Sequence, residues 1–88
     1  MKGTYYSEKT GKYTAYVKVG HVLRVAGYFD TEIEAIRTYN HYAVETRGND
    51  AELIDTGDEM EMMQYKLRMH FVELEHKLRL IEQFIKTH

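Results

Sequence analysis

Cysteine, proline and tryptophan are all missing from this 88-residue sequence, and its longest apolar runs are only a few residues. The absence of cysteine excludes disulfides and thiolate metal sites, so nothing indicates an oxidising compartment. The apolar runs are far shorter than the roughly 20 residues that a membrane span requires. We therefore expect a cytosolic protein without a membrane partner. At this length one domain is expected, and a core so small favours stabilisation by self-association.

Acidic residues are scarce in the first third of the chain. Residues 1–27 contain a single acid, Glu8, and five bases, so this segment carries +4, whereas the whole chain carries −2. The five bases are Lys2, Lys9, Lys12, Lys18 and Arg24. A basic segment on an acidic protein is compatible with a polyanionic partner, although scattered lysines are also common on solvated surfaces.

The first 50 residues show a strand pattern followed by a helix pattern. Residues 3–29 predict an antiparallel meander of three strands. Within them, residues 13–19 and 21–25 are rich in β-branched and aromatic side chains, with Gly20 placed for a tight turn. The motif Thr31-x-x-Glu34 is a capping box, and apolar residues at helical spacing follow it until Gly48. Because three strands alone cannot bury a core, this helix must pack against one face of the sheet.

A second capping box, Asp58-x-x-Glu61, opens a helix predicted to run nearly to His88, about 45 Å at 1.5 Å per residue. Its apolar residues recur in steps of three or four, a heptad rhythm with one stutter at Phe71. This rhythm predicts an oligomer interface at Met63, Leu67, Phe71, Leu74, Leu78, Ile81 and Ile85. Further apolar residues widen the stripe beyond a two-stranded seam, namely Met62, Met69, Val72, Leu80 and Phe84. The simpler alternative is that the helix only covers its own domain.

These patterns predict an α+β fold. A three-stranded antiparallel sheet packs on one helix and is followed by a long C-terminal amphipathic helix. We divide the chain into a sheet-plus-helix binding domain at residues 1–56 and an oligomerisation helix at residues 57–88.

Three motifs within residues 2–55 resemble the Apetala/ethylene-response-factor DNA-binding domain, a module also appended to many phage homing endonucleases. The motifs are Gly27-Tyr28-Phe29-Asp30-Thr31, the pair Tyr39 and Ala43, and Arg47-Gly48 with Ala51 and Leu53. The resemblance implies a three-stranded sheet packed on a helix, with the outer sheet face in the DNA major groove. The long C-terminal helix lies outside the resemblance.

Compared with this family, the sequence keeps only part of the expected DNA-reading face. Lys2 and Lys18 match basic family contacts. The departures are Tyr5, Tyr16, Leu23 and Val25, at positions where family members carry Arg, Glu, Arg and Trp, respectively. Lysine positions phosphates, whereas base readout favours bidentate side chains such as Arg. The apolar substitutions are therefore also compatible with a face that contacts protein.

No arrangement of residues indicates catalysis. The sequence has no cysteine nucleophile, no Gly-x-Ser-x-Gly motif and no phosphate-binding glycine loop. The pair Glu73-x-x-His76 has the spacing used in di-iron bundles but fits a solvated helix surface equally well. We predict no enzyme activity, no cofactor and no metal site.

Two functions remain open. The first is a small phage-type oligomer that binds DNA or another nucleic acid through its basic sheet. Its contacts are expected from Lys2, Tyr5, Lys9, Lys12, Tyr16, Lys18 and Arg24. The alternative is a phage anti-defence protein, similar in outline to Thoeris anti-defence proteins. Such a protein sequesters a cyclic nucleotide signal such as a cyclic ADP-ribose, or inhibits a host defence protein. If the chain is of phage origin, it would act in the cytoplasm of a bacterial host.

Overall fold

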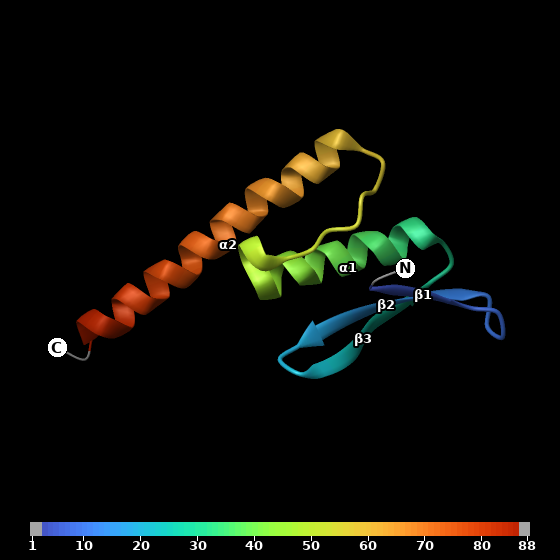
Figure 1. The fold of residues 1–88 in the computed structure, drawn as a ribbon, viewed down its shortest axis with the longest axis horizontal. Helices are drawn as coiled ribbons and strands as arrows, with labels where there is room; N and C mark the ends of the chain where they lie inside the picture. The colour runs from blue at the N-terminus through green and yellow to red at the C-terminus, as the bar shows by residue number, and fades with distance from the viewer. Residues whose placement is uncertain (1–2, 87–88) are drawn as a thin grey trace.

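The computed structural model describes residues 3–86 and confirms the predicted fold class (Figure 1). The elements are β1 (Thr4–Ser7), β2 (Lys12–Val19), β3 (Val22–Phe29), α1 (Glu32–Arg47), the short 3-10 helix η1 (Gly48–Asp50) and α2 (Glu59–Lys86). The helix α1 lies between the sheet and α2 (Figure 1). Within the described residues, α2 contacts α1 and η1 but none of the strands. The molecule measures 56 × 30 × 15 Å.

The sheet is an antiparallel meander in the order β1-β2-β3. Gly20, with φ of +64°, supplies the left-handed turn conformation between β2 and β3. The pairing of β2 with β3 shifts by one residue between Ala15 and Tyr16, an irregularity of the kind that increases strand twist. The short β1 pairs with only the first half of β2. The second half of β2 therefore extends past the end of β1.

Both ends of α1 are closed as the sequence predicts. The Thr31 hydroxyl accepts a hydrogen bond from the Glu34 backbone N–H, which caps the first turn. At the other end, Gly48 has φ of +56° and its N–H donates to the Val44 carbonyl. Glycine is required there because other residues rarely adopt positive φ.

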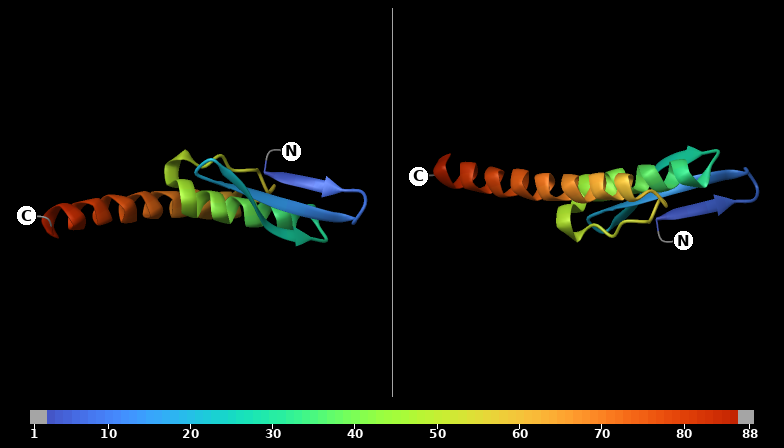
Figure 2. Two further views of the ribbon diagram at one scale, coloured as in Figure 1. Left: turned by 90° about the horizontal axis from the view of Figure 1, so that it is seen from below. Right: turned by 90° about the horizontal axis from the view of Figure 1, so that it is seen from above.

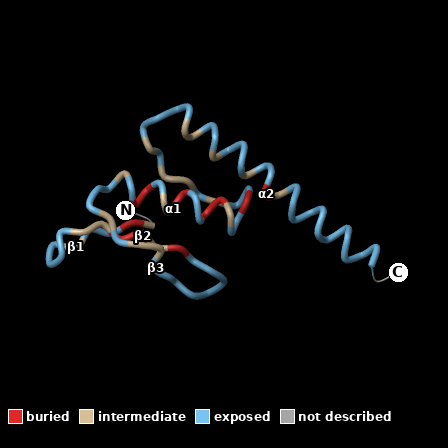
Figure 3. The backbone as a smooth tube through the Cα atoms, turned by 180° about the vertical axis from the view of Figure 1, so that it is seen from behind, coloured by how far each residue is buried: buried red, intermediate tan, exposed pale blue. Residues whose placement is uncertain are grey.

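The core lies between α1 and β2. Ala15 on β2 and Ala35 on α1 are both 0% exposed, and Tyr39 and Ala43 complete the buried cluster. Small residues on both sides let the helix approach the sheet closely. Figure 3 shows that the buried positions concentrate on α1 and the middle of the sheet, whereas most of α2 is exposed.

A buried asparagine attaches the linker between η1 and α2 to α1. The Asn40 side chain is 0% exposed; its Nδ2 donates to the Ile54 carbonyl at 2.8 Å, and its Oδ1 accepts from the Ile54 N–H at 2.9 Å. One side chain thus satisfies both backbone groups of Ile54, as buried polar groups require. The linker is thereby held along α1.

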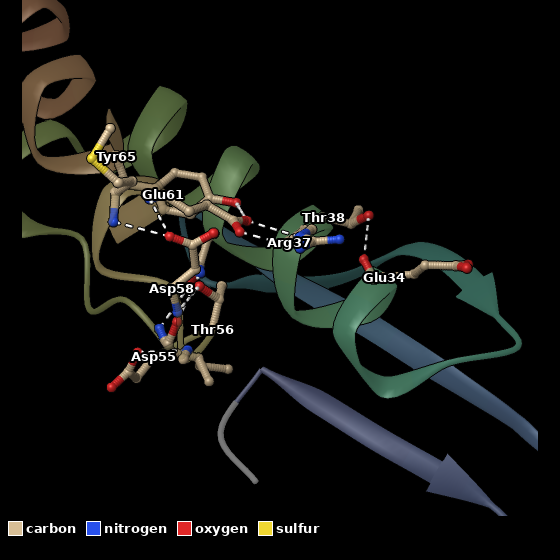
Figure 4. A network of polar contacts seen from close by, with 12 residues as sticks. Glu34, Arg37, Thr38, Asp55, Thr56, Asp58, Glu61 and Tyr65 are labelled. Atoms are coloured by element: carbon tan, nitrogen blue, oxygen red, sulfur yellow. Dashed lines mark hydrogen bonds and ion pairs between the residues drawn. The ribbon is translucent and has the colours of Figure 1, made fainter. Parts of the chain in front are cut away.

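The helix α2 begins with the predicted cap. Asp58 Oδ1 accepts from the backbone N–H groups of Met60 and Glu61, at 3.0 and 3.2 Å (Figure 4). Its 28 residues span about 42 Å. Only its first half packs on the domain, and its second half projects away, as Figure 2 shows from two sides. No helix within residues 3–86 combines the length and the apolar composition needed to cross a membrane.

Two reciprocal ion pairs join α1 to α2. Arg37 Nε of α1 donates to Glu61 of α2 at 2.8 Å, and Arg68 Nε of α2 donates to Glu45 of α1 at 2.7 Å (Figure 4 shows the first pair). The hydrogen bond from Arg37 lowers the pKa of Glu61, and the bond from Arg68 lowers the pKa of Glu45. Burial raises the pKa of Tyr65, whose hydroxyl donates to Glu61. The two pairs fix how α2 lies along α1.

The wide apolar stripe predicted for α2 divides into two faces. Val72 is 2% exposed, and Met62 and Met69 are half-buried, so these three residues pack on the helix's own domain. The seven predicted interface residues are instead exposed, with exposed fractions from 54% at Ile81 to 66% at Ile85. The two alternatives are thus not exclusive, because one face of α2 covers its own domain and another face presents the exposed stripe.

Candidate ligand-binding face of the sheet

The sheet face opposite α1, here called the outer face, carries tyrosines. Ala15 and Val17 of β2 are buried against α1, so the alternating residues Thr14 and Tyr16 point to the outer face. Thr14 pairs with Tyr5 of β1 on one side and with Tyr28 of β3 on the other. Directly opposed residues share a face, so the two tyrosines flank Thr14. The exposed fractions are 60% for Tyr5 and 68% for Tyr28, but only 4% for Thr14.

An aliphatic row continues the outer face towards the turn between β2 and β3. Val25 pairs with Tyr16, and Leu23 pairs with Lys18. Leu23 is 65% exposed and Val25 is 47% exposed. The outer face therefore offers aromatic and aliphatic surface with few polar groups between them.

The cations predicted for binding are not gathered into one patch. Lys18 is exposed on the outer face, whereas Lys12 forms an ion pair with Asp30 across the sheet. Lys9 lies in the turn between β1 and β2. Arg24 pairs with the buried Val17 and so points to the opposite face from Lys18. The remaining predicted contact, Lys2, lies outside the described residues.

A cavity of about 370 Å³ opens beside the half of β2 that extends past β1. Tyr5, Tyr16 and Lys18 line it from the sheet, and Tyr39 and Arg47 line it from α1. The Tyr39 hydroxyl donates to the Glu52 carbonyl at 2.8 Å, which fixes the ring as a wall of the cavity. The structure thus brings three of the predicted contact residues together at one site.

Arg47, like Tyr39, lines this site although the sequence did not predict it as a ligand contact. In the sequence it belongs to one of the motifs of the family resemblance and precedes the helix-ending Gly48. Its position in the last turn of α1 carries it to the cavity, next to the part of the sheet that holds Lys18. A basic residue in a last helical turn usually serves the helix dipole, so its sequence position alone did not indicate this role.

Residues 3–86 contain no group of three or more His, Asp or Glu side chains that could hold a metal ion. The Glu73 carboxylate accepts the backbone N–H of Asn49 at 3.1 Å, so it ties α2 to η1. Glu73, the first residue of the Glu73-x-x-His76 motif, thus has a structural role.

Comparisons of the chain with models of known protein families, with curated proteins and with solved structures give no match. The resemblance to the Apetala/ethylene-response-factor domain stays a prediction that rests on the motifs quoted above.

Proposed function

We propose that this protein is a self-associating, non-enzymatic module that binds nucleic acid on the outer face of its sheet. The observation that carries the proposal is the exposed pair Tyr5 and Tyr28 on either side of Thr14, with Lys18 on the same face. Large aromatic rings left in water on a small sheet are available to a ligand with flat faces.

The chemistry of the outer face favours unpaired bases over a duplex. Exposed aromatic rings on a sheet stack single-stranded bases, and each stacked base contributes about 1–3 kcal/mol. The outer-face residues of the three strands include no Arg, Asn or Gln, the side chains that read base edges in the major groove. Lys18 supplies a cation for the phosphate backbone, which positions a strand without reading its sequence.

Loss of one stacking ring is the test. Replacing Tyr28 by Ala removes a ring that is 68% exposed, so its fold contribution is small, while binding of a labelled oligo(dT) 12-mer should weaken about 5- to 150-fold. Tyr42→Ala is the matched control, because Tyr42 is 43% exposed on α1, away from the sheet. Fluorescence anisotropy with the single strand and with its duplex measures both affinities. Equal losses in the two variants, or no binding by the unmodified protein, would refute the proposal.

A second candidate function is sequestration of a small nucleotide. The observation that favours it is the cavity of about 370 Å³, within the size range of small-molecule sites, in which Tyr39 and two cations meet. An aromatic wall can stack a base while Lys18 and Arg47 neutralise phosphates.

Calorimetric titration with cyclic ADP-ribose tests this second function. Arg47→Ala should then abolish the heat of binding while leaving the affinity for oligo(dT) unchanged, because Arg47 lies on α1 and not on the outer face. Binding of oligo(dT) without any heat from the nucleotide would leave the outer face as the only supported site.

A further inference from the structure

The helix α2 has two apolar faces on opposite sides. At 3.6 residues per turn, Met62, Met69 and Val72, which pack on the domain, lie about half a turn away from the exposed apolar residues. Seven of those exposed residues form two rows with a spacing of seven, here called the seam; Met63, Leu80 and Phe84 are exposed outside these rows. The seam consists of Met60, Leu67, Leu74 and Ile81 in one row and Phe71, Leu78 and Ile85 in the other.

We infer that the seam pairs with the seam of a second copy of this chain as a parallel two-stranded coiled coil. Rows seven residues apart, offset by three or four, are the a and d positions of a heptad repeat. Gln64, which is also exposed, lies seven residues before Phe71 and takes the first a position. A single polar residue at an a position is a device that sets the register of two strands.

The number of strands follows from the charged e flank of the seam. The e positions are Glu61, Arg68, Glu75 and Glu82, and the g positions are Met63, His70, Lys77 and Phe84. Met63 and Phe84 are exposed and widen the apolar surface at its two ends on the g side, whereas Met62, Met69 and Val72 pack on the domain. Because three or more strands would bury the e flank as well, the four charged residues on it favour two strands.

The parallel orientation follows from the charges on the flanks. In a parallel pair each g position meets the following e position of the other chain. Lys77 then meets Glu82 of the second copy, and His70 meets Glu75. In an antiparallel pair e meets e and g meets g, so the acids Glu61 and Glu82 face each other on one flank and the bases His70 and Lys77 on the other. Arg68 is engaged within its own chain, by Glu45 at 2.7 Å and by Glu75 at 3.6 Å. The contact of Lys77 with Glu82 is therefore the charged pair that favours the parallel orientation.

The rest of the fold leaves the seam accessible. The helix α1 and the sheet lie on the other side of α2, so a second copy can contact the seam from Met60 to Ile85, about 38 Å, without meeting the domain (Figure 1). The order of layers across the pair is sheet, α1, α2, α2, α1, sheet. The two outer faces consequently point in opposite directions. If the proposed function holds, and only then, one dimer joins two nucleic-acid segments.

Cysteine crosslinking tests the orientation, since the chain has no cysteine of its own. Met60→Cys and Ile85→Cys chains, one of them enlarged by a tag, are mixed, unfolded and refolded together, and then oxidised. A parallel pair places each position beside its own copy, so we expect disulfides between two residues at 60 and between two at 85. Positions 60 and 85 are about 38 Å apart along the helix, far beyond the reach of a disulfide. A product that joins 60 to 85 would overturn the parallel orientation.

His76→Cys is the matched control for the crosslinking. This residue is exposed but lies on the side of α2 opposite the seam, so it should give no dimer band under the same oxidation. Crosslinking of the His76→Cys chain as complete as at the two seam positions would show random collision and refute the pairing.

The assignment of the interface is tested by two neighbouring leucines. Leu78 in the seam is 58% exposed and Leu80 outside it is 66% exposed, so either substitution by Glu leaves the isolated domain intact. Light scattering coupled to gel filtration should give twice the chain mass of 10.5 kDa for the unmodified protein and for Leu80→Glu, and the mass of one chain for Leu78→Glu. A dimer that survives Leu78→Glu, or an unmodified protein that is monomeric or a larger oligomer, would overturn the inference. Neither experiment includes nucleic acid, so its result is independent of the proposed binding of nucleic acid.

Discussion

Replacing Asn40 by Ala is expected to destabilise the fold more than any other removal of a single polar side chain in α1. Asn40 is 0% exposed and makes two hydrogen bonds to Ile54, at 2.8 and 2.9 Å. Alanine removes both partners of the Ile54 backbone and leaves its N–H and carbonyl in a half-buried environment.

The magnitude follows from these two bonds. A neutral hydrogen bond contributes about 0.5–1.5 kcal/mol, and a buried group left unsatisfied costs about 1–3 kcal/mol. We therefore expect Asn40→Ala to lower the free energy of unfolding by about 2–4 kcal/mol. For a domain of this size that change lowers Tm by roughly 10–25 °C.

Thermal and urea unfolding followed by circular dichroism measure the effect. All variants must be compared at the same chain concentration, because the inferred self-association would couple stability to concentration. Asn49→Ala is the control, since the Asn49 side chain is exposed and its hydrogen bond to Glu73 uses the backbone N–H. It should change the free energy of unfolding by less than about 0.5 kcal/mol. If Asn40→Ala is as stable as Asn49→Ala, the linker does not depend on this clamp and the reasoning is refuted.

Two further perturbations act on the junction of α1 and α2. Gly48→Ala should lower the free energy of unfolding by about 1–3 kcal/mol, because the residue has φ of +56° and an added methyl group would come within 2.5 Å of Glu73 Oε1. Gly57→Ala is the control, because Gly57 also has positive φ but no atom lies within 4 Å of the added carbon, so this variant introduces backbone strain without a clash. Equal losses of unfolding free energy in the two variants would mean that the clash is unimportant. The second perturbation is pH: because Arg68 lowers the pKa of Glu45 below its ordinary 4.5, this pair stabilises the fold fully above that pH and progressively less as the pH falls through the folded-state pKa. Urea midpoints measured from pH 6 to pH 3 should therefore fall less in Arg68→Gln than in the unmodified protein, and parallel curves would contradict the linkage.

The division of α2 into two faces explains how a domain with so small a core is held together. Val72 and its half-buried neighbours add apolar burial to α1, and the two arginine–glutamate pairs fix the crossing of the helices. The second half of α2 adds nothing to the core of its own chain and presents only exposed apolar rows. In the dimer inferred above, those rows would contribute about 1.5–3 kcal/mol for each Leu or Ile that becomes fully buried.

The elements and their ends could be predicted from the sequence, because these depend on neighbours within a few residues. The strand composition and Gly20 predicted the hairpin of β2 and β3. Thr31 and Asp58 predicted the first turns of the two helices, and Gly48 predicted the end of α1. Local backbone preferences and side-chain caps carry this information, so no knowledge of distant contacts was needed.

Which partner each side chain meets could not be predicted in this way, because it depends on how the elements pack. Periodicity placed Val72 and Leu74 in one broad apolar stripe, but packing against α1 buries the first and leaves the second exposed. Likewise, the basic first third suggested one charged patch, whereas strand pairing places Lys18 and Arg24 on opposite faces. Arg47 reaches the cavity of Lys18 only because the last turn of α1 lies beside β2. Contacts between elements depend on how whole faces pack. The spacing of residues along the chain predicts which residues share a face, but not which other element that face packs against.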